Sequence, residues 1–133
     1  MWIFSKFGFY SIVHKDGGYQ VRAREKKDLS NIISACGFFD KEIKESVLTD
    51  YQYRICVSKE EVFIIMEILG DSIDYSNFKS MIDSRPDQRN KPYHKIWNVL
   101  ATALGCYGEF FDKIQFQIPR NKGRREFFWG VGT

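Results

Sequence analysis

The sequence predicts an α+β fold in which an antiparallel sheet packs on helices and a β-hairpin follows at the C-terminal end. Two stretches predict the sheet, because residues 1–24 read as a β-hairpin turned at Asp16-Gly17-Gly18 and residues 51–57 alternate apolar and polar side chains. Helices are predicted where apolar residues recur at steps of three and four. We expect one domain over residues 1–133, with a core of 1–105 and a hairpin extension of 106–133.

The N-terminal hairpin has two unlike faces, because facing positions across a two-residue turn sum to an odd number. The expected core face holds Phe4, Tyr10, Ile12, Tyr19, Val21 and Ala23. The opposite face mixes aromatic and basic side chains: Phe7, Phe9, Ser11, Val13, Gln20, Arg22 and Arg24. Strand 51–57 is expected to extend both faces, with Tyr51, Tyr53, Ile55 and Val57 toward the core and Gln52, Arg54 and Cys56 on the mixed face.

Two longer helices are expected beside the sheet. The first follows Asp28, carries Leu29, Ile32 and Ile33 on one face, and stops at Gly37. The second starts at a capping box that begins at Ser58 and runs through Leu69 to a stop at Gly70. Because this second helix is apolar nearly all round, we expect it to be the central buried helix.

The second half of the chain predicts two more helices and a basic hairpin. Asp74 or Ser76 is expected to cap a short helix, and Pro92 suits the first turn of a helix that stops at Gly105. After it, Ile114, Phe116 and Ile118 alternate with polar residues, which is typical of a strand. The tip of the predicted hairpin is basic and contains Arg120, Lys122, Arg124 and Arg125.

Charge is unevenly distributed along the chain. Residues 1–27 carry six Lys or Arg against two acids, residues 84–133 carry nine against four, and residues 28–83 carry five against eleven. If the two basic ends reach one side of the fold, they form a positive patch that attracts phosphates or an acidic protein. A scattered, solvated surface is the alternative.

Several classes of protein are disfavoured. His14 and His94 lack the partner spacing of a zinc site, and no glycine-rich phosphate loop is present, so we expect neither a catalytic site nor a cofactor. The three cysteines are far apart, which favours a reducing compartment such as the cytoplasm, or the host cytoplasm if the source is a virus. The aromatic start is neither a signal peptide nor a membrane span, so no membrane partner is expected.

A set of short motifs runs through residues 1–100. It comprises Met1-Trp2-Ile3-Phe4, Gly8-Phe9-Tyr10-Ser11, Val21-Arg22-Ala23-Arg24, Asp50-Tyr51, Tyr53-Arg54, Asp74-Tyr75-Ser76-Asn77-Phe78-Lys79, and Tyr93-His94 with Trp97. This pattern resembles a family of small, uncharacterised bacterial proteins. The resemblance implies no activity and therefore no catalytic residue.

Three hypotheses for function follow. The first is a non-catalytic protein that binds an anionic partner, either nucleic acid or a nucleoprotein complex, because exposed aromatics stack on bases and arginines bind phosphates. Its expected binding residues are Phe7, Phe9, Arg22, Arg24, Arg54, Arg120, Lys122, Arg124 and Arg125. The second is an inhibitor of a single protein target, of the immunity or anti-defence (phage-type) kind. The third is a small-ligand or nucleotide pocket lined by Tyr75, Asn77, Lys79 and His94.

Overall fold

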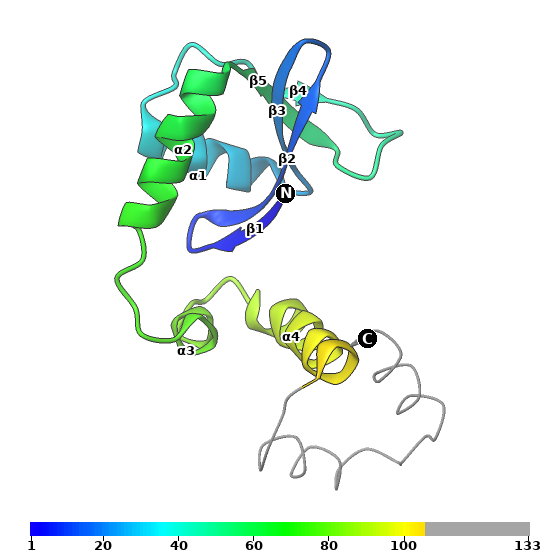
Figure 1. The fold of residues 1–133 in the computed structure, drawn as a ribbon, viewed down its shortest axis with the longest axis vertical. Helices are drawn as coiled ribbons and strands as arrows, with labels where there is room; N and C mark the ends of the chain where they lie inside the picture. The colour runs from blue at the N-terminus through cyan, green and yellow to red at the C-terminus, as the bar shows by residue number, and fades with distance from the viewer. Residues whose placement is uncertain (106–133) are drawn as a thin grey trace, which may run out of the picture. The chain divides into compact units, whose positions relative to one another are not determined.

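The computed structural model describes residues 1–105, which divide after Asp74 into two compact units (Figure 1). The elements of the first unit are β1 (Trp2–Ser5), β2 (Gly8–Lys15), β3 (Gly18–Ala23), α1 (Lys26–Cys36), β4 (Lys44–Glu45), β5 (Tyr53–Val57) and α2 (Lys59–Asp71). The described part of the second unit contains α3 (Phe78–Asp83) and α4 (Asn90–Leu104). An antiparallel sheet with helices confirms the predicted α+β class, whereas the C-terminal hairpin lies outside the described residues.

The sheet has the strand order β1-β2-β3-β5-β4, and every pair in it is antiparallel. The turn between β2 and β3 is the predicted tight one, since Asp16 and Gly17 both have positive φ values, 56° and 76°. It sets Ser11 opposite Arg22, which confirms the predicted odd-sum register. The sheet therefore grows from the β2-β3 hairpin in both directions.

The first 24 residues contain three strands and not two. A second turn at Lys6 and Phe7 folds β1 back onto β2, where Phe4 pairs with Phe9 and Ile3 with Tyr10. The placement of Phe4 on the core face was therefore wrong, because this turn ends the alternation that would link it to Tyr10. The turn is closed by Ser5, whose Oγ donates to the Gly8 carbonyl oxygen at 3.0 Å.

Gly8 allows α1 to approach the sheet closely. Its φ is 151°, and a Cβ placed there would lie 2.3 Å from Cγ of Asp28, a buried residue in the first turn of α1. The Asp28 carboxylate accepts a hydrogen bond from the Phe9 N–H at 3.1 Å, and the Asp28 carbonyl oxygen accepts one from the Tyr10 hydroxyl at 2.6 Å. Glycine at position 8 is thus what lets one buried carboxylate hold α1 against β2.

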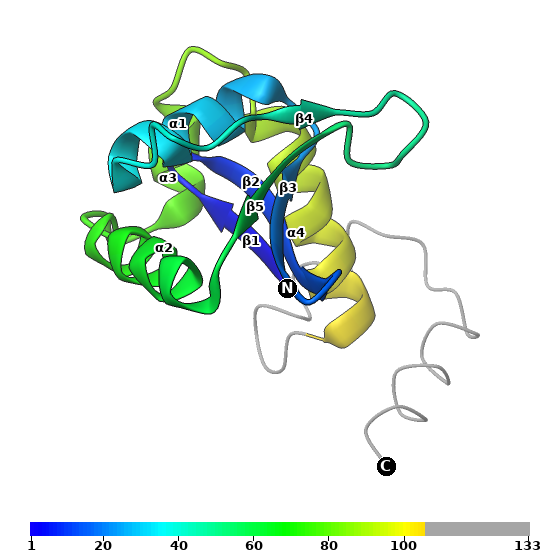
Figure 2. The same ribbon diagram turned by 90° about the horizontal axis from the view of Figure 1, so that it is seen from above.

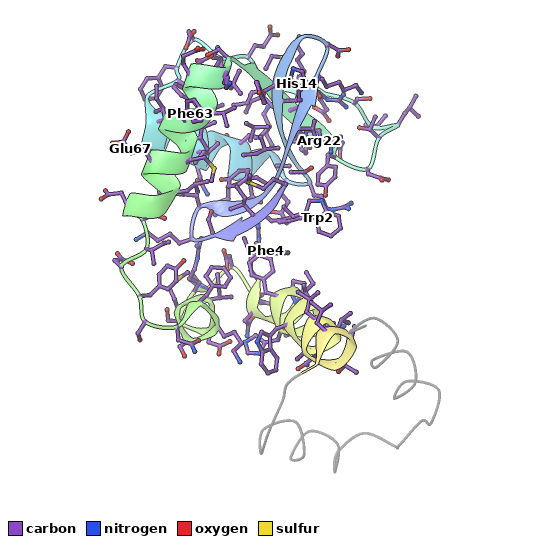
Figure 3. All side chains as sticks on the ribbon, in the orientation of Figure 1. Trp2, Phe4, His14, Arg22, Phe63 and Glu67 are labelled. Carbon is purple, nitrogen blue, oxygen red and sulfur yellow. The ribbon has the colours of Figure 1, made fainter. Side chains whose placement is uncertain are left out.

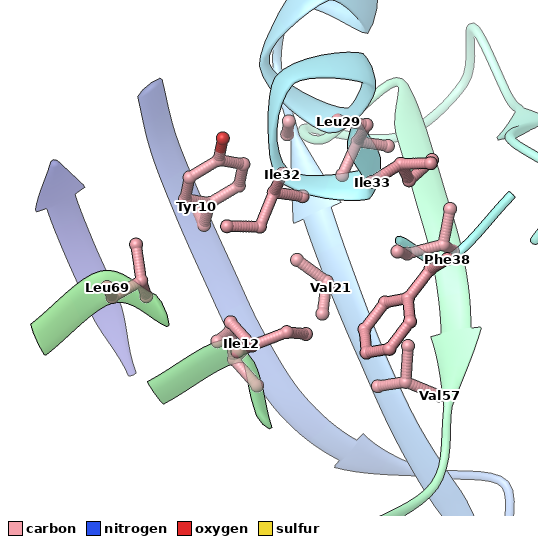
Figure 4. Close-up of a cluster of buried hydrophobic side chains, with 12 residues drawn as sticks. Tyr10, Ile12, Val21, Leu29, Ile32, Ile33, Phe38, Val57 and Leu69 are labelled. Atoms are coloured by element: carbon pink, nitrogen blue, oxygen red, sulfur yellow. The ribbon is translucent and has the colours of Figure 1, made fainter. Parts of the chain in front are cut away.

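Helices α1 and α2 pack on the same face of the sheet and enclose the core (Figure 2). Figure 4 shows part of this core. Its buried members are Tyr10, Ile12, Val21, Ala23, Leu29, Ile32, Ile33, Phe38, Ile55, Val57, Ile65 and Leu69. Helix α1 begins at Lys26, before the predicted start after Asp28, and ends as predicted, with Leu29, Ile32 and Ile33 buried and Gly37 in the left-handed conformation at φ 73°.

Helix α2 is less buried than its composition predicts. Its capping box is present, because Ser58 Oγ accepts from the Glu61 N–H and Glu61 Oε1 accepts from the Ser58 N–H. However, only Ile65 and Leu69 are buried, while Phe63 is 62% exposed. The prediction of a central buried helix was wrong, because a single side of α2 reaches the core. The helix also continues past Gly70 to Asp71.

The described part of the second unit is a pair of helices. Asn77, and not the predicted Asp74 or Ser76, caps α3 by accepting from the Ser80 N–H at 3.1 Å. Pro92 lies in the first turn of α4, as predicted, and α4 ends before Gly105. The aromatic rings of Phe78 and Tyr93 stack between the two helices, with centroids 6.1 Å apart.

Candidate functional site

The face of the sheet opposite α1 and α2 carries a row of side chains that crosses all five strands. In the strand register Trp2 is opposite Ser11, Ser11 opposite Arg22, Arg22 opposite Arg54, and Arg54 opposite Lys44. Directly opposed residues point to the same face and lie about 5 Å apart between neighbouring strands. The row therefore runs from an indole on the edge strand β1 to three cations on β3, β5 and the opposite edge strand β4.

We call the surface around this row the aromatic-basic face. Its members are Trp2, Phe4, Phe9, Ser11, Arg22, Arg24, Lys44, Tyr51 and Arg54. In Figure 3, Trp2 and Arg22 lie on the side of the sheet away from α2. The prediction that Arg22 and Arg54 share a face is confirmed by their direct pairing between β3 and β5.

Tyr51 is the centre of the basic half of this face. The guanidinium carbons of Arg22 and Arg24 lie 4.8 and 4.7 Å from the centroid of its ring. Tyr51 was predicted to point into the core with Tyr53, and that placement was wrong. Strand β5 begins only at Tyr53, so strand alternation does not extend back to position 51. The Tyr51 side chain is instead buried beneath the two arginines.

The aromatic half lies on β1 and β2. Phe4 and Phe9 stack with centroids 4.5 Å apart, and Trp2 meets Phe9 edge to face at 6.4 Å. Phe9 is also 6.3 Å from the Tyr51 ring, so the two halves are continuous. Trp2 is 72% exposed and thus offers most of its indole surface to a partner.

Phe7 does not belong to this face, although the sequence placed it there. It lies in the turn between β1 and β2 and packs, partly buried, against the hydrophobic core. Its carbonyl oxygen accepts a hydrogen bond from Asn31 of α1 at 2.9 Å. The sequence did not place four members on this face: Trp2, Phe4, Lys44 and Tyr51. Their places depend on the β1-β2 turn, on the pairing of β4 and on where β5 begins.

The three arginines of the face have no carboxylate partner within residues 1–105. Arg22 donates to the Ser11 hydroxyl at 2.8 Å and Arg24 to the Asp50 backbone carbonyl at 2.9 Å. Arg54 donates to the Thr49 hydroxyl at 2.9 Å. Each guanidinium is thus oriented by a neutral oxygen and not by a carboxylate of the described residues.

Two further polar atoms on this face lack a hydrogen bond. Arg22 Nε and Gln20 Oε1 are buried and have no hydrogen-bond partner among residues 1–105, although Gln20 and Arg22 are neighbours on the same side of β3. Buried donors and acceptors in folded proteins are nearly always satisfied. On β3, one hydrogen-bond donor and one acceptor are therefore available to a bound partner.

The residues predicted to line a ligand pocket have partners within the second unit. Asn77 caps α3, Lys79 Nζ lies 3.5 Å from the centroid of the Trp97 ring, and His94 Nε2 is 2.9 Å from an Asp83 carboxylate oxygen. The Tyr75 ring packs against Phe78 at 5.7 Å. These contacts account for each of the four side chains, and a role for them in ligand binding stays a prediction.

Some predicted features fall outside the structure or concern absences. Arg120, Lys122, Arg124 and Arg125 lie outside the described residues. Among residues 1–105, no group of three or more His, Cys, Asp and Glu side chains is arranged to hold a metal ion. Every helix in that range is too short or too polar for a transmembrane span.

The chain was compared with family models, with curated proteins and with solved structures, and none of the three comparisons found a match. The proposal for its function therefore depends on the geometry of the described residues.

Proposed function

We propose that this protein binds single-stranded nucleic acid through the aromatic-basic face. The observation that carries the proposal is the row from Trp2 to Lys44, in which an exposed indole is followed by cations that have no carboxylate partner within residues 1–105. Proteins that bind single strands combine cations along the backbone path with aromatic rings on which bases stack. Both components occur here on one sheet surface.

The arrangement of the arginines favours the binding of a phosphate group. Arg22 and Arg54 are directly opposed on neighbouring strands, and like charges in that position destabilise a sheet. A phosphate placed between them removes the repulsion and forms charge-assisted hydrogen bonds. Binding is therefore expected to raise the stability of the folded chain as well as to occupy the face.

The aromatic half supplies the preference for bases over simple anions. Trp2 is exposed at the end of the row, and its indole is held edge to face against Phe9. Stacking of a base on an aromatic side chain contributes about 1–3 kcal/mol and needs no fixed sequence. Since paired bases have their faces covered, this half of the site favours an unpaired strand.

Fluorescence anisotropy with labelled oligo-dT and oligo-U of fifteen nucleotides tests the proposal. Affinity should fall steeply as salt rises, because phosphate contacts release counterions. Arg24→Gln should weaken binding and reduce the salt slope by about one. Trp2→Ala should cost about 1–3 kcal/mol with little change in that slope. Lys27→Gln, which removes one exposed charge on α1 and so on the other side of the sheet, is the matched control.

The possible outcomes separate nucleic acid from other partners. If inorganic polyphosphate competes as well as oligo-dT and Trp2→Ala has no effect, the face binds anions without reading bases, and the proposal fails. It fails also if Lys27→Gln weakens binding as much as Arg24→Gln does. A single protein partner that stays bound at high salt, with no affinity for oligonucleotides, would support the inhibitor hypothesis instead.

A further inference from the structure

The outward side of α2 is an apolar surface that the core does not use. Phe63 is 62% exposed, Ile64 41% and Met66 39%, although the opposite side of the same helix is buried at Ile65 and Leu69. Three large apolar side chains exposed on one helix form a patch of the kind that marks protein contacts. This surface lies on the far side of the core from the aromatic-basic face, so a partner for it is independent of the proposed function.

Two charges of opposite sign stand at equal distances from Phe63, while Glu60, three residues before Phe63, is a further exposed acid on this helix. Lys59 and Glu67 stand four residues before and four residues after Phe63, so all three lie along one side of the helix. At 1.5 Å per residue, each charge is about 6 Å along the helix axis from Phe63. Both side chains are exposed, and neither makes an ion pair within residues 1–105. Glu67 points from α2 away from the sheet (Figure 3).

We infer that α2 is the interface of a homodimer in which the α2 helices of two copies pack antiparallel around Phe63. A twofold axis at Phe63 sets Lys59 of each copy opposite Glu67 of the other, which gives two ion pairs from one chain's pattern. A parallel arrangement would instead oppose like charges at both positions. The antiparallel arrangement also places the partially positive N-terminal end of each helix beside the partially negative C-terminal end of the other, which is favourable.

The pattern selects a second copy over an unrelated partner because it is self-complementary. An unrelated protein could bind Phe63 with an apolar groove alone. Such binding would not require opposite charges at equal distances on either side of Phe63. Packing of two helices at a shallow crossing angle lets residues one turn on either side of the centre meet. Since the contact involves a single helix from each copy, we expect a weak dimer at the low end of interface sizes.

Sedimentation velocity of the full chain over a range of concentrations, after nuclease treatment, tests the inference. The unmodified protein should show a monomer–dimer equilibrium. Phe63→Lys should give monomer at every concentration, and because this side chain is mostly exposed the variant should fold. Circular dichroism checks that it does.

Charge reversal tests the antiparallel register itself. Lys59→Glu alone and Glu67→Lys alone each oppose like charges at both pairs, and each should weaken dimerisation about tenfold. The double variant, with both changes in one chain, should restore the original affinity. Mixing the two single variants should give a heterodimer stronger than either homodimer, because every pair is then attractive. Lys27→Glu on α1 is the control for a nonspecific effect of charge.

Two results would overturn the inference. The first is a chain that stays monomeric at every accessible concentration, which would leave α2 to another partner or to another segment of the same chain. The second is a dimer that either survives Phe63→Lys or responds to Phe63→Lys but not to the charge reversals, since the interface or its register would then be different.

Discussion

Replacing Gly8 with alanine should destabilise the fold far more than an ordinary surface substitution. The backbone at this position has φ 151°, a conformation that costs a residue with a side chain about 1–3 kcal/mol. The new methyl carbon would also fall 2.3 Å from Cγ and 2.5 Å from Oδ1 of Asp28. Relief requires the buried carboxylate to move away from the Phe9 N–H, and overpacking of this kind costs about 1–3 kcal/mol more. The expected loss is about 2–6 kcal/mol.

Urea unfolding followed by circular dichroism measures this loss, with Gly37→Ala as the matched control. Gly37 has φ 73° but open space around the position of a Cβ, so the control carries only the backbone cost of about 1–2 kcal/mol. A Gly8→Ala variant no less stable than Gly37→Ala would refute the argument that close approach of α1 requires glycine at position 8. An unchanged m-value would confirm that both variants alter stability and not the unfolding mechanism.

Three further predictions concern α2 and Tyr51. Burial raises the pKa of Glu61, but the hydrogen bonds from Lys41 and Ser58 outweigh it and hold the net pKa below its ordinary value. The resulting stabilisation of the fold is present above the unfolded pKa of about 4.5 and is lost as pH falls through the lower folded pKa. The urea midpoint should therefore decrease at acid pH, and Lys41→Met should make this decrease smaller. Ser58→Ala removes the helix cap and should cost about 1 kcal/mol by the same unfolding assay. Tyr51→Leu removes the ring beneath two guanidinium groups and should cost about 1–2 kcal/mol, whereas Tyr51→Phe should keep most of that stability.

Local signals predicted the elements that are defined by a few neighbouring residues. The Asp16-Gly17 turn fixed the register of β2 and β3 because positive φ at both positions is rare outside such turns. Gly37 marked the end of α1, and the Ser58–Glu61 capping box marked the start of α2, for equally local reasons. The shared face of Arg22 and Arg54 followed from these elements.

The features that the sequence did not reveal depend on contacts between distant residues or on the ends of strands. The turn at Lys6 and Phe7 has no Asn-Gly or Asp-Gly signal, so β1 was merged with β2 and Phe4 was placed on the wrong face. Tyr51 precedes the first residue of β5, where alternation no longer applies. The exposure of Phe63 depends on which side of α2 meets the core, which an all-apolar helix does not specify.

The short strand β4 has a consequence for the behaviour of the protein at high concentration. This edge of the sheet is only two residues long, Lys44–Glu45, and both side chains are charged and exposed. A long, apolar edge would offer free N–H and C=O groups to a strand from another molecule and so begin fibril growth. Strand β4 is too short and too highly charged for a strand of another molecule to pair with it. The chain is thus protected at this edge against amyloid-like stacking, even though its sequence is rich in the aromatic and β-branched residues that promote it.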